Sequence, residues 1–521
     1  MRKKKSAINM FVGVLVQMEI VLLGILNRRF FIHNLSIDYL GCNAVFVNIL
    51  EILSLVCCGA SAITYLMIKA LASDDQEQVR RAFKINHVYQ WVTCGALGVV
   101  GIILSPLLPA LLENSTGFEW QFLQIVYFIF LVDVCITNWS GIAGSPGYYD
   151  CIIKVSQNSA VCSIFDCIVK NIYMIGQCII LIYYKNYIFY LCISVVTKVL
   201  YVFLTRWYCY KHFPYLKGKI TVTREHIKES NIFAEIRNNI ALVFAMVVFN
   251  GTDNIVITTF LGITIAGIYS NYQTIYNQLR GLLSKFINGM SMSVADYVHR
   301  TAEDDKKTAL FYNVQFLCGV VGVVSTCCFF SLIQPFITLV FGDGLLLNIW
   351  QVIIISVLLF LNIFVTGSAM FRHSMGKYWL DRNFQLLSAA VNLILSIALA
   401  SVMGLSGILV GTIAGTLVIS QGYLKVIKIE AIRTFDKIKW WFETLLWTGA
   451  ISATLCLLTI LVENIDFTIS GMAFRLSISI AMSMFLVTVI CTISKNNRNC
   501  ALFYVGQIKN IAKEFKGRMD E

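Results

Sequence analysis

The chain has 521 residues, of which 58% are hydrophobic and only 13% are charged, and its mean hydropathy is +0.73. Soluble domains carry about 25% charged residues, so this composition excludes an ordinary soluble protein. A net charge of +12 would suggest nucleic acid as the partner of a soluble chain. In a membrane protein we expect such cations to set the topology instead, with no nucleic-acid partner.

Apolar runs of about 20 residues without strand-like alternation predict helical spans. In chain order, the predicted spans lie near residues 8–27, 42–68, 86–108, 122–143, 158–183, 186–205, 239–262, 267–294, 309–334, 350–371, 384–402, 405–424, 440–462 and 472–493. The predicted fold is therefore an all-α polytopic membrane protein with about fourteen transmembrane helices.

The placement of the cations agrees with this set of spans. If the N-terminus is cytoplasmic, thirty-three of the 41 Lys and Arg residues fall in alternate, cytoplasmic segments. Four fall outside and four inside spans. Positive residues accumulate on the cytoplasmic side, so we expect a multi-pass membrane protein with both termini in the cytoplasm.

An internal repeat relates two parts of the chain at an offset of 226 residues. Residues 34–53 align with residues 260–279, so that Leu35 meets Leu261 and Gly41 meets Gly267. Both segments read as a turn, a glycine and then a span. Such repeats are typical of transporters whose substrate path lies between two lobes.

The repeat and the loop lengths predict the domain organisation. We expect two pseudo-symmetric six-helix lobes around a central cavity, followed by two additional helices. The predicted boundaries are residues 1–205 for the N-terminal lobe, 206–238 for a cytoplasmic interlobe linker, 239–424 for the C-terminal lobe, 425–493 for transmembrane helices 13 and 14, and 494–521 for a basic amphipathic tail.

The eighth predicted span carries an ordered row of polar side chains. At 100° per residue they share an arc of about 80° on one helix face. The row consists of Gln273, Asn277, Arg280, Ser284, Asn288 and Ser291. The uncharged members have two interpretations, either packing between helices or lining of a cavity.

Arg280 is the cation nearest the middle of this span. It has no acid three or four residues away, and a charge at that depth costs about 2.5–3.5 kcal/mol on insertion scales. We therefore expect Arg280 to line a cavity, facing an acid on another helix, water or an anionic substrate. The repeat places Glu51 opposite as one candidate acid. Lys285 is off the row and nearer the cytoplasm, where snorkelling accounts for it.

Other charges are candidates for ion coupling or for structural pairs. Asp166 and Lys170 are spaced to neutralise each other within one helix. Asp253 either carries a coupling ion, H⁺ or Na⁺, or pairs with Lys198 or Arg280. At the outer end of the first span, Arg28 and Arg29 contact either lipid head groups or an anion at the mouth of the cavity.

The sequence contains no motif that predicts an enzyme. It has no P-loop, no nucleophile elbow and no histidine or cysteine spacing typical of a metal site. The predicted outside loops are too short for a polymerase or glycosyltransferase site. We expect no catalytic residues, no metal and no cofactor.

Two short motifs resemble those of Wzx-type polysaccharide flippases. In the first, Arg28, Phe31, Leu35 and Tyr39 precede Leu40-Gly41. The second consists of Thr252 and Asp253 followed by Leu261 and Gly262. The Wzx-type flippases belong to the superfamily that includes MATE multidrug exporters and lipid II flippases.

The resemblance implies two six-helix lobes that open alternately to each side of the bacterial cytoplasmic membrane. It implies a substrate, an oligosaccharide repeat unit on undecaprenyl pyrophosphate, that is flipped for O-antigen, capsule or other surface polysaccharide. Partner proteins would be the polysaccharide polymerase and chain-length machinery, besides membrane lipids. Fourteen spans match lipid II flippases, whereas many Wzx-type proteins have twelve. A lipid II flippase and a MATE-like small-molecule exporter therefore remain alternatives.

Overall fold

The computed structural model describes residues 19, 23–53, 60–72, 75–107, 119–142, 147–156, 158–217, 243–249, 251–288, 290–301, 303–342, 344–375 and 378–519. Throughout these ranges the regular structure is helical. Eleven helices of the described part are long and apolar enough to cross a membrane. This confirms the predicted class, an all-α polytopic membrane protein.

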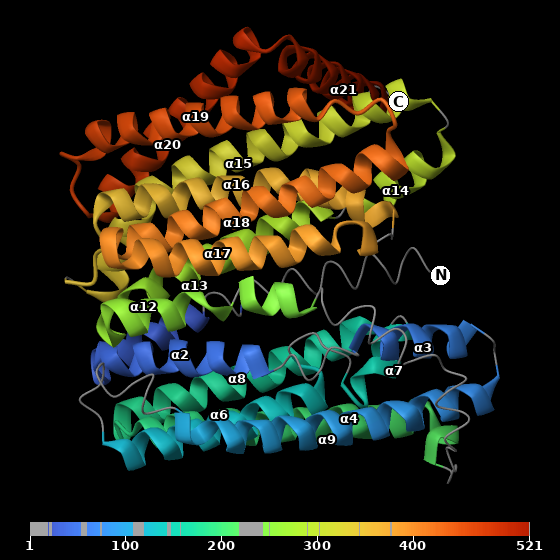
Figure 1. Cartoon of the computed structure of the whole chain (residues 1–521), viewed down its shortest axis with the longest axis vertical. Helices are drawn as coiled ribbons and strands as arrows, with labels where there is room; N and C mark the ends of the chain where they lie inside the picture. Colours follow the sequence, from blue (N-terminus) through green and yellow to red (C-terminus); the bar gives the residue numbers. More distant parts are fainter. Residues whose placement is uncertain are drawn as a thin grey trace. The chain divides into compact units, whose positions relative to one another are not determined.

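The chain divides into two compact units, residues 1–267 and 268–521. The first unit contains the helices α2 (Ile37–Leu53), α3 (Ala60–Ala72), α4 (Gln76–Leu104), α6 (Trp120–Ser140), α7 (Asp150–Val155), α8 (Ser159–Tyr183), α9 (Tyr187–His212) and α12 (Asp253–Leu261), and the 3₁₀ turns η2 (Ser105–Leu107) and η3 (Pro214–Lys217). Within this unit α9 packs against both α8 and α6, and α6 packs against α4 (Figure 1).

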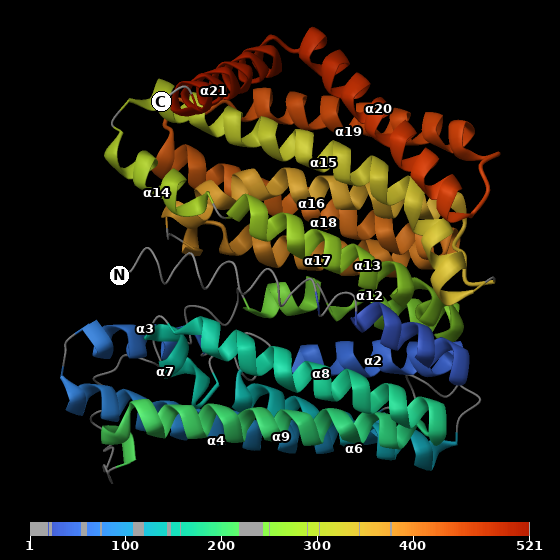
Figure 2. The ribbon, with the colours of Figure 1, turned by 180° about the vertical axis from the view of Figure 1, so that it is seen from behind.

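The second unit takes up most of α13 (Ile263–Asn288) and the remaining helices. These are α14 (Ser291–Arg300), α15 (Asp304–Phe341), α16 (Ile349–Met375), α17 (Arg382–Met403), α18 (Leu405–Val426), α19 (Lys437–Val462), α20 (Ile469–Ile493) and α21 (Lys495–Met519), with the short elements η4 (Tyr378–Leu380) and η5 (Ile427–Ala431). Seen from behind, α16 lies between α15 and α18, which in turn packs along α17 (Figure 2).

The predicted spans coincide with observed helices. Each span from 86–108 to 472–493 overlaps a helix of the described part. The predicted span 42–68 corresponds to α2 and α3, and most of the first span lies outside the described residues. Because much of the linker, residues 218–242, is also outside them, the predicted lobe boundaries stay a prediction.

The two helices that the sequence places after both lobes, α19 and α20, join the core of the second unit. Trp440 and Trp447 of α19 are fully buried. The Trp447 ring lies 6.0 Å from the Phe316 ring of α15 and 6.4 Å from the Phe360 ring of α16, measured between centroids. Such large buried aromatic side chains supply much of the packing in a helical core.

The internal repeat appears in the first unit as a reciprocal contact. Helix α2 begins at Ile37 and α13 begins at Ile263, 226 residues later. A side-chain carbon on Gly41 would clash with the Ile263 carbonyl oxygen, and one on Gly267 would lie 2.6 Å from the Ile37 carbonyl oxygen. Gly41 meets Ile263, and Gly267 meets Ile37, which is the residue equivalent to Ile263 in the other copy. The contact therefore has the form of a two-fold interface. The structure thus supports the offset read from the sequence.

Candidate functional site

Helix α13 coincides with the eighth predicted span but is not among the eleven helices of the described part that are apolar enough to cross a membrane. Its tyrosines attach it to the second unit. Tyr272 and Tyr276 are buried on one face of the helix. The Tyr272 hydroxyl accepts a 3.0 Å hydrogen bond from the Leu347 backbone N–H. The Tyr276 hydroxyl accepts one of 2.9 Å from the Asn362 side-chain amide. These bonds fix the rotation of α13 about its axis.

The predicted polar row lies beside this tyrosine face. Gln273 and Asn277 directly follow Tyr272 and Tyr276, so they lie about 100° further around the helix. In the structure Asn277 is exposed, while Gln273, Arg280 and Ser284 are half-buried. The row is therefore accessible along part of its length. The side chains of Lys285, Asn288 and Ser291 lie outside the described residues.

Arg280 lies close to a cluster of buried polar groups from α16, α17 and α18. Its positive charge acts on the phenol of Tyr423 in α18, which also interacts with Gln385 and Asp381. The Arg372 guanidinium lies 5.6 Å from the centroid of the same tyrosine ring. Among the described side chains, no acid forms an ion pair with Arg280.

Arg372 and Asp381 form the ion pair at the centre of this cluster. The Arg372 Nε donates to Asp381 Oδ2 and its Nη2 donates to Asp381 Oδ1, both at 3.0 Å. Gln385 adds a third donor to the carboxylate at 3.0 Å. Arg372 is only 4% exposed and Asp381 is fully buried. Two parallel bonds between a guanidinium and a carboxylate are among the strong hydrogen bonds in proteins.

Nothing in the sequence indicates that Arg372 is buried. Hydropathy ends the span near residue 371, whereas α16 continues to Met375 and keeps Arg372 inside the unit. A count of cations cannot distinguish a hydrated loop arginine from one that is buried against an acid. The spacing of Arg372 and Asp381 gives no periodic signal, because the chain turns between them.

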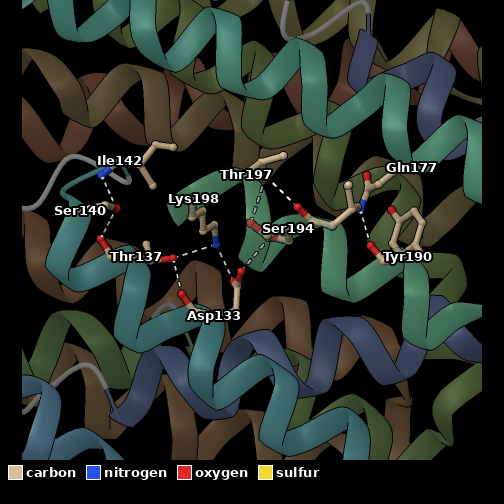
Figure 3. Close-up of polar contacts among 10 residues, drawn as sticks. Asp133, Thr137, Ser140, Ile142, Gln177, Tyr190, Ser194, Thr197 and Lys198 are labelled. Carbon is tan, nitrogen blue, oxygen red and sulfur yellow. Dashed lines mark hydrogen bonds and ion pairs between the residues drawn. The ribbon is translucent and has the colours of Figure 1, made fainter. Parts of the chain in front are cut away.

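In the first unit, Asp133 and Lys198 form a second ion pair within the membrane-spanning helices. The Lys198 Nζ lies 2.5 Å from Asp133 Oδ2 and 2.7 Å from the Thr137 hydroxyl (Figure 3). The other Asp133 oxygen accepts a 2.8 Å hydrogen bond from Ser194. The pair joins α6 to α9. Lys198 was a suggested partner of Asp253, but in the structure its carboxylate partner is Asp133.

The remaining candidates on α8 form an ion pair of their own. Lys170 Nζ lies 2.7 Å from Asp166 Oδ2. This confirms the predicted pairing within one helix. The next residue, Asn171, donates a 2.9 Å hydrogen bond to the carboxylate of Glu19. Polar and charged groups therefore follow the length of α8, and their role in ion coupling stays a prediction.

Three other predicted positions are placed without a defined role. Asp253 is buried at the start of α12, where it is 7% exposed. Arg28 is half-buried and Arg29 is exposed. The side chain of Glu51 lies outside the described residues, so the suggested approach of Glu51 to Arg280 stays a prediction.

Comparisons with known proteins find similarity at the level of the fold. No protein-family model matches the chain, and no curated protein matches it. The lipid II flippase MurJ, in an inward closed conformation, superposes with a TM-score of 0.66 at 14% identity, covering 93% of this chain and 98% of that one.

Two multidrug transporters are also similar. An inward-facing multidrug resistance MATE family transporter of the MOP superfamily gives a TM-score of 0.59 at 12% identity, covering 80% of this chain and 97% of that one. The eukaryotic MATE transporter AtDTX14 gives 0.59 at 12% identity, covering 87% and 99%. The chain therefore has the fold that these flippase and exporter structures share.

Proposed function

We propose that this protein is a flippase that moves undecaprenyl-pyrophosphate-linked oligosaccharide units across the cytoplasmic membrane for surface polysaccharide synthesis. The observation that carries the proposal is the half-buried Arg280 on the polar row of α13, without an acidic ion-pair partner among the described side chains. The fold shared with MurJ and the MATE transporters supports a transporter. The Wzx-like motifs favour an oligosaccharide as the cargo.

The physical argument concerns the charge of the cargo. A pyrophosphate carries negative charge that must leave water to cross the membrane, and this is costly without a counter-charge. An arginine fork matches phosphate oxygens and stays protonated in a membrane environment. The amides and hydroxyls of Gln273, Asn277 and Ser284, on the same row, would hydrogen-bond sugar hydroxyls.

A MATE-like exporter of organic cations is the second candidate function. Its support is the set of acids within the spans, chiefly the buried Asp253. A cationic cargo would favour an acidic path, and Asp133 and Asp166 do not offer one because each pairs with a lysine. Coupling by H⁺ or Na⁺, with Asp253 as its carrier, fits either function.

The test is a comparison of two cargoes in one preparation. The purified chain is reconstituted into liposomes that contain a fluorescent undecaprenyl-pyrophosphate oligosaccharide, and head groups in the outer leaflet are quenched from outside. The expected result is that the protein reduces the fraction of fluorescent head groups that are protected from the quencher, and that an ion gradient makes this reduction faster. Efflux of an organic cation from the same liposomes, with oligosaccharide movement at the protein-free level, would instead establish the exporter.

A further inference from the structure

A basic groove lies at the end of α9, outside the ion pairs described above. It has a volume of about 610 Å³ and is lined by Arg206, Trp207, Tyr210, Lys211 and Lys217. Pockets that bind small ligands in proteins commonly measure about 300–1,000 Å³. The groove belongs entirely to the first unit, at the end of α9 that the charge distribution predicts to be cytoplasmic.

The turn that follows α9 builds the groove. The Phe213 backbone N–H donates to the Cys209 carbonyl oxygen at 2.8 Å, and the chain then reverses through η3. Leu216 anchors this turn, because it is buried in a hydrophobic cluster of the unit. The reversal carries the neighbouring Lys217 back toward Tyr210. Cations that are up to eleven residues apart thereby face one groove.

Each cation of the groove lies near an aromatic ring. Arg206 and Lys217 are each 5.9 Å from the centroid of the Tyr210 ring. Lys211 is 4.9 Å from the centroid of the Trp207 ring. Such contacts hold cationic groups in place, but they neutralise no charge.

The groove has a surplus of positive charge. None of its five lining residues is acidic. In the described part of the chain, none of the three cations belongs to an ion pair. Like charges around one groove repel each other, and a bound anion would remove that repulsion. Arginine and lysine together fit a phosphate, which accepts hydrogen bonds at several oxygens.

An apolar stripe on α9 leads along the helix to this groove. Val196 and Phe203 are 62% and 60% exposed, and Trp207, one turn beyond Phe203, is 58% exposed. With Val199 they are spaced three or four residues apart, so they share one helix face. In a span, such an exposed apolar face lies against lipid chains, and tryptophan and tyrosine mark the membrane surface. The cations of the groove therefore lie next to an apolar helix face against which acyl chains can pack.

We propose that this groove binds the phosphodiester head group of an anionic phospholipid, with an acyl chain along the stripe from Val196 to Trp207. Basic pockets at the cytoplasmic ends of spans bind acidic lipid head groups in this way. The site is separate from the Arg280 row, and the inference does not depend on the proposed transport function.

The test uses the delipidated full-length chain in detergent, titrated with phosphatidylglycerol or phosphatidylcholine, with bound lipid counted by native mass spectrometry. The variant R206Q/K211Q/K217Q removes the three cations of the groove. The control R300Q/K306Q/K307Q removes the same charge from the segment around α14, where Arg300 and Lys306 are exposed and Lys307 is half-buried. A third variant, R206K/K211R/K217R, keeps the charge of the groove.

We expect the groove variant to bind phosphatidylglycerol at least fivefold more weakly than wild type, while the control and the charge-retaining variant bind it normally. Phosphatidylcholine should bind more weakly than phosphatidylglycerol. Inorganic phosphate should not displace bound phosphatidylglycerol. The single variant K217Q should show a smaller loss, so the test does not rest on the triple variant alone. Unchanged binding in both R206Q/K211Q/K217Q and K217Q, equal binding of the two lipids, or full displacement of phosphatidylglycerol by inorganic phosphate would overturn the proposal.

Discussion

Thr264 donates a 2.8 Å hydrogen bond from its Oγ1 to the Asp38 carboxylate, and these two residues are 226 positions apart. That separation equals the offset of the internal repeat, so the bond joins two equivalent positions. It lies one turn before Gly41 and Gly267, where the two copies touch through their backbones. The repeat is therefore a physical contact in the molecule as well as a resemblance between sequences.

Gly41→Ala and Gly267→Ala should each destabilise the protein. The new methyl group would clash with a backbone carbonyl oxygen, which cannot rotate away as a flexible side chain can. Overpacking of this kind costs about 1–3 kcal/mol. The measurement is the thermal unfolding midpoint of the purified protein in one detergent. Gly95→Ala is the matched control, since its methyl group would meet nothing within 4 Å. Equal midpoints for G41A and G95A would refute the close contact.

Removing one partner of the Asp133–Lys198 pair should be more damaging than removing both. The side chains are only 15% and 20% exposed, so either single variant leaves a charge in an apolar surrounding. Loss of one partner of a buried pair costs about 3–5 kcal/mol. Unfolding midpoints of wild type, D133N, K198M and D133N/K198M provide the measurement. The account requires the double variant to be more stable than either single variant, and a double variant that is less stable than both would contradict it.

Arg475→Gln should destabilise the end of α19. The Arg475 Nη2 donates to the carbonyl oxygens of Val462 and Ile465 at 2.8 and 2.6 Å, and the side chain is only 5% exposed. A cation at a helix C-terminus also interacts favourably with the helix dipole. Loss of a hydrogen bond to a charged group costs about 1.5–3 kcal/mol. Arg433→Gln, at an exposed arginine, is the control for the midpoint measurement, and an equal effect of both changes would exclude the capping role.

Asp150, in the short helix α7 outside the predicted spans, should give the protein a pH-dependent stability. Burial raises the pKa of Asp150 to about 6, despite the Lys154 amine 2.5 Å away and the Gly147 N–H that donates to it at 2.9 Å. The folded state therefore holds this proton up to a higher pH than the unfolded state does. Stability should fall as the pH rises from about 4 to about 6.

The comparison of wild type with Asp150→Asn measures this effect. Asparagine carries no titrating proton and can still accept the Gly147 hydrogen bond through its side-chain oxygen. Over the same pH range the midpoint of D150N should therefore vary less than that of wild type. An identical pH profile for the two proteins would mean that the protonation of Asp150 does not contribute to the pH dependence of stability.

The features that could be predicted from the sequence are local or periodic. Hydropathy locates the spans because each apolar run must match the membrane thickness by itself. The Asp166–Lys170 pair follows from one helical turn, and the repeat offset follows from the alignment of Gly41 with Gly267. The sequence also placed Arg280 on a polar helix face, which the partial exposure of that face supports.

The features that the sequence missed depend on which helices pack together. Lys198 finds Asp133 across 65 residues, and no periodicity links them. Nothing in the sequence around Arg475 indicates that it is buried against the end of α19. Partner choice is set by side-chain packing between helices, which hydropathy and charge counts do not contain.

The central claim, transport of a pyrophosphate-linked oligosaccharide past Arg280, is tested most directly by the rate of head-group translocation in liposomes with wild type, R280Q and R280K. Lys307→Gln serves as the control for loss of one cation, and each preparation is first shown to have the wild-type unfolding midpoint. The account predicts at least a tenfold lower rate for R280Q, substantial recovery in R280K and no change in the control. Translocation by folded R280Q at the wild-type rate would contradict it.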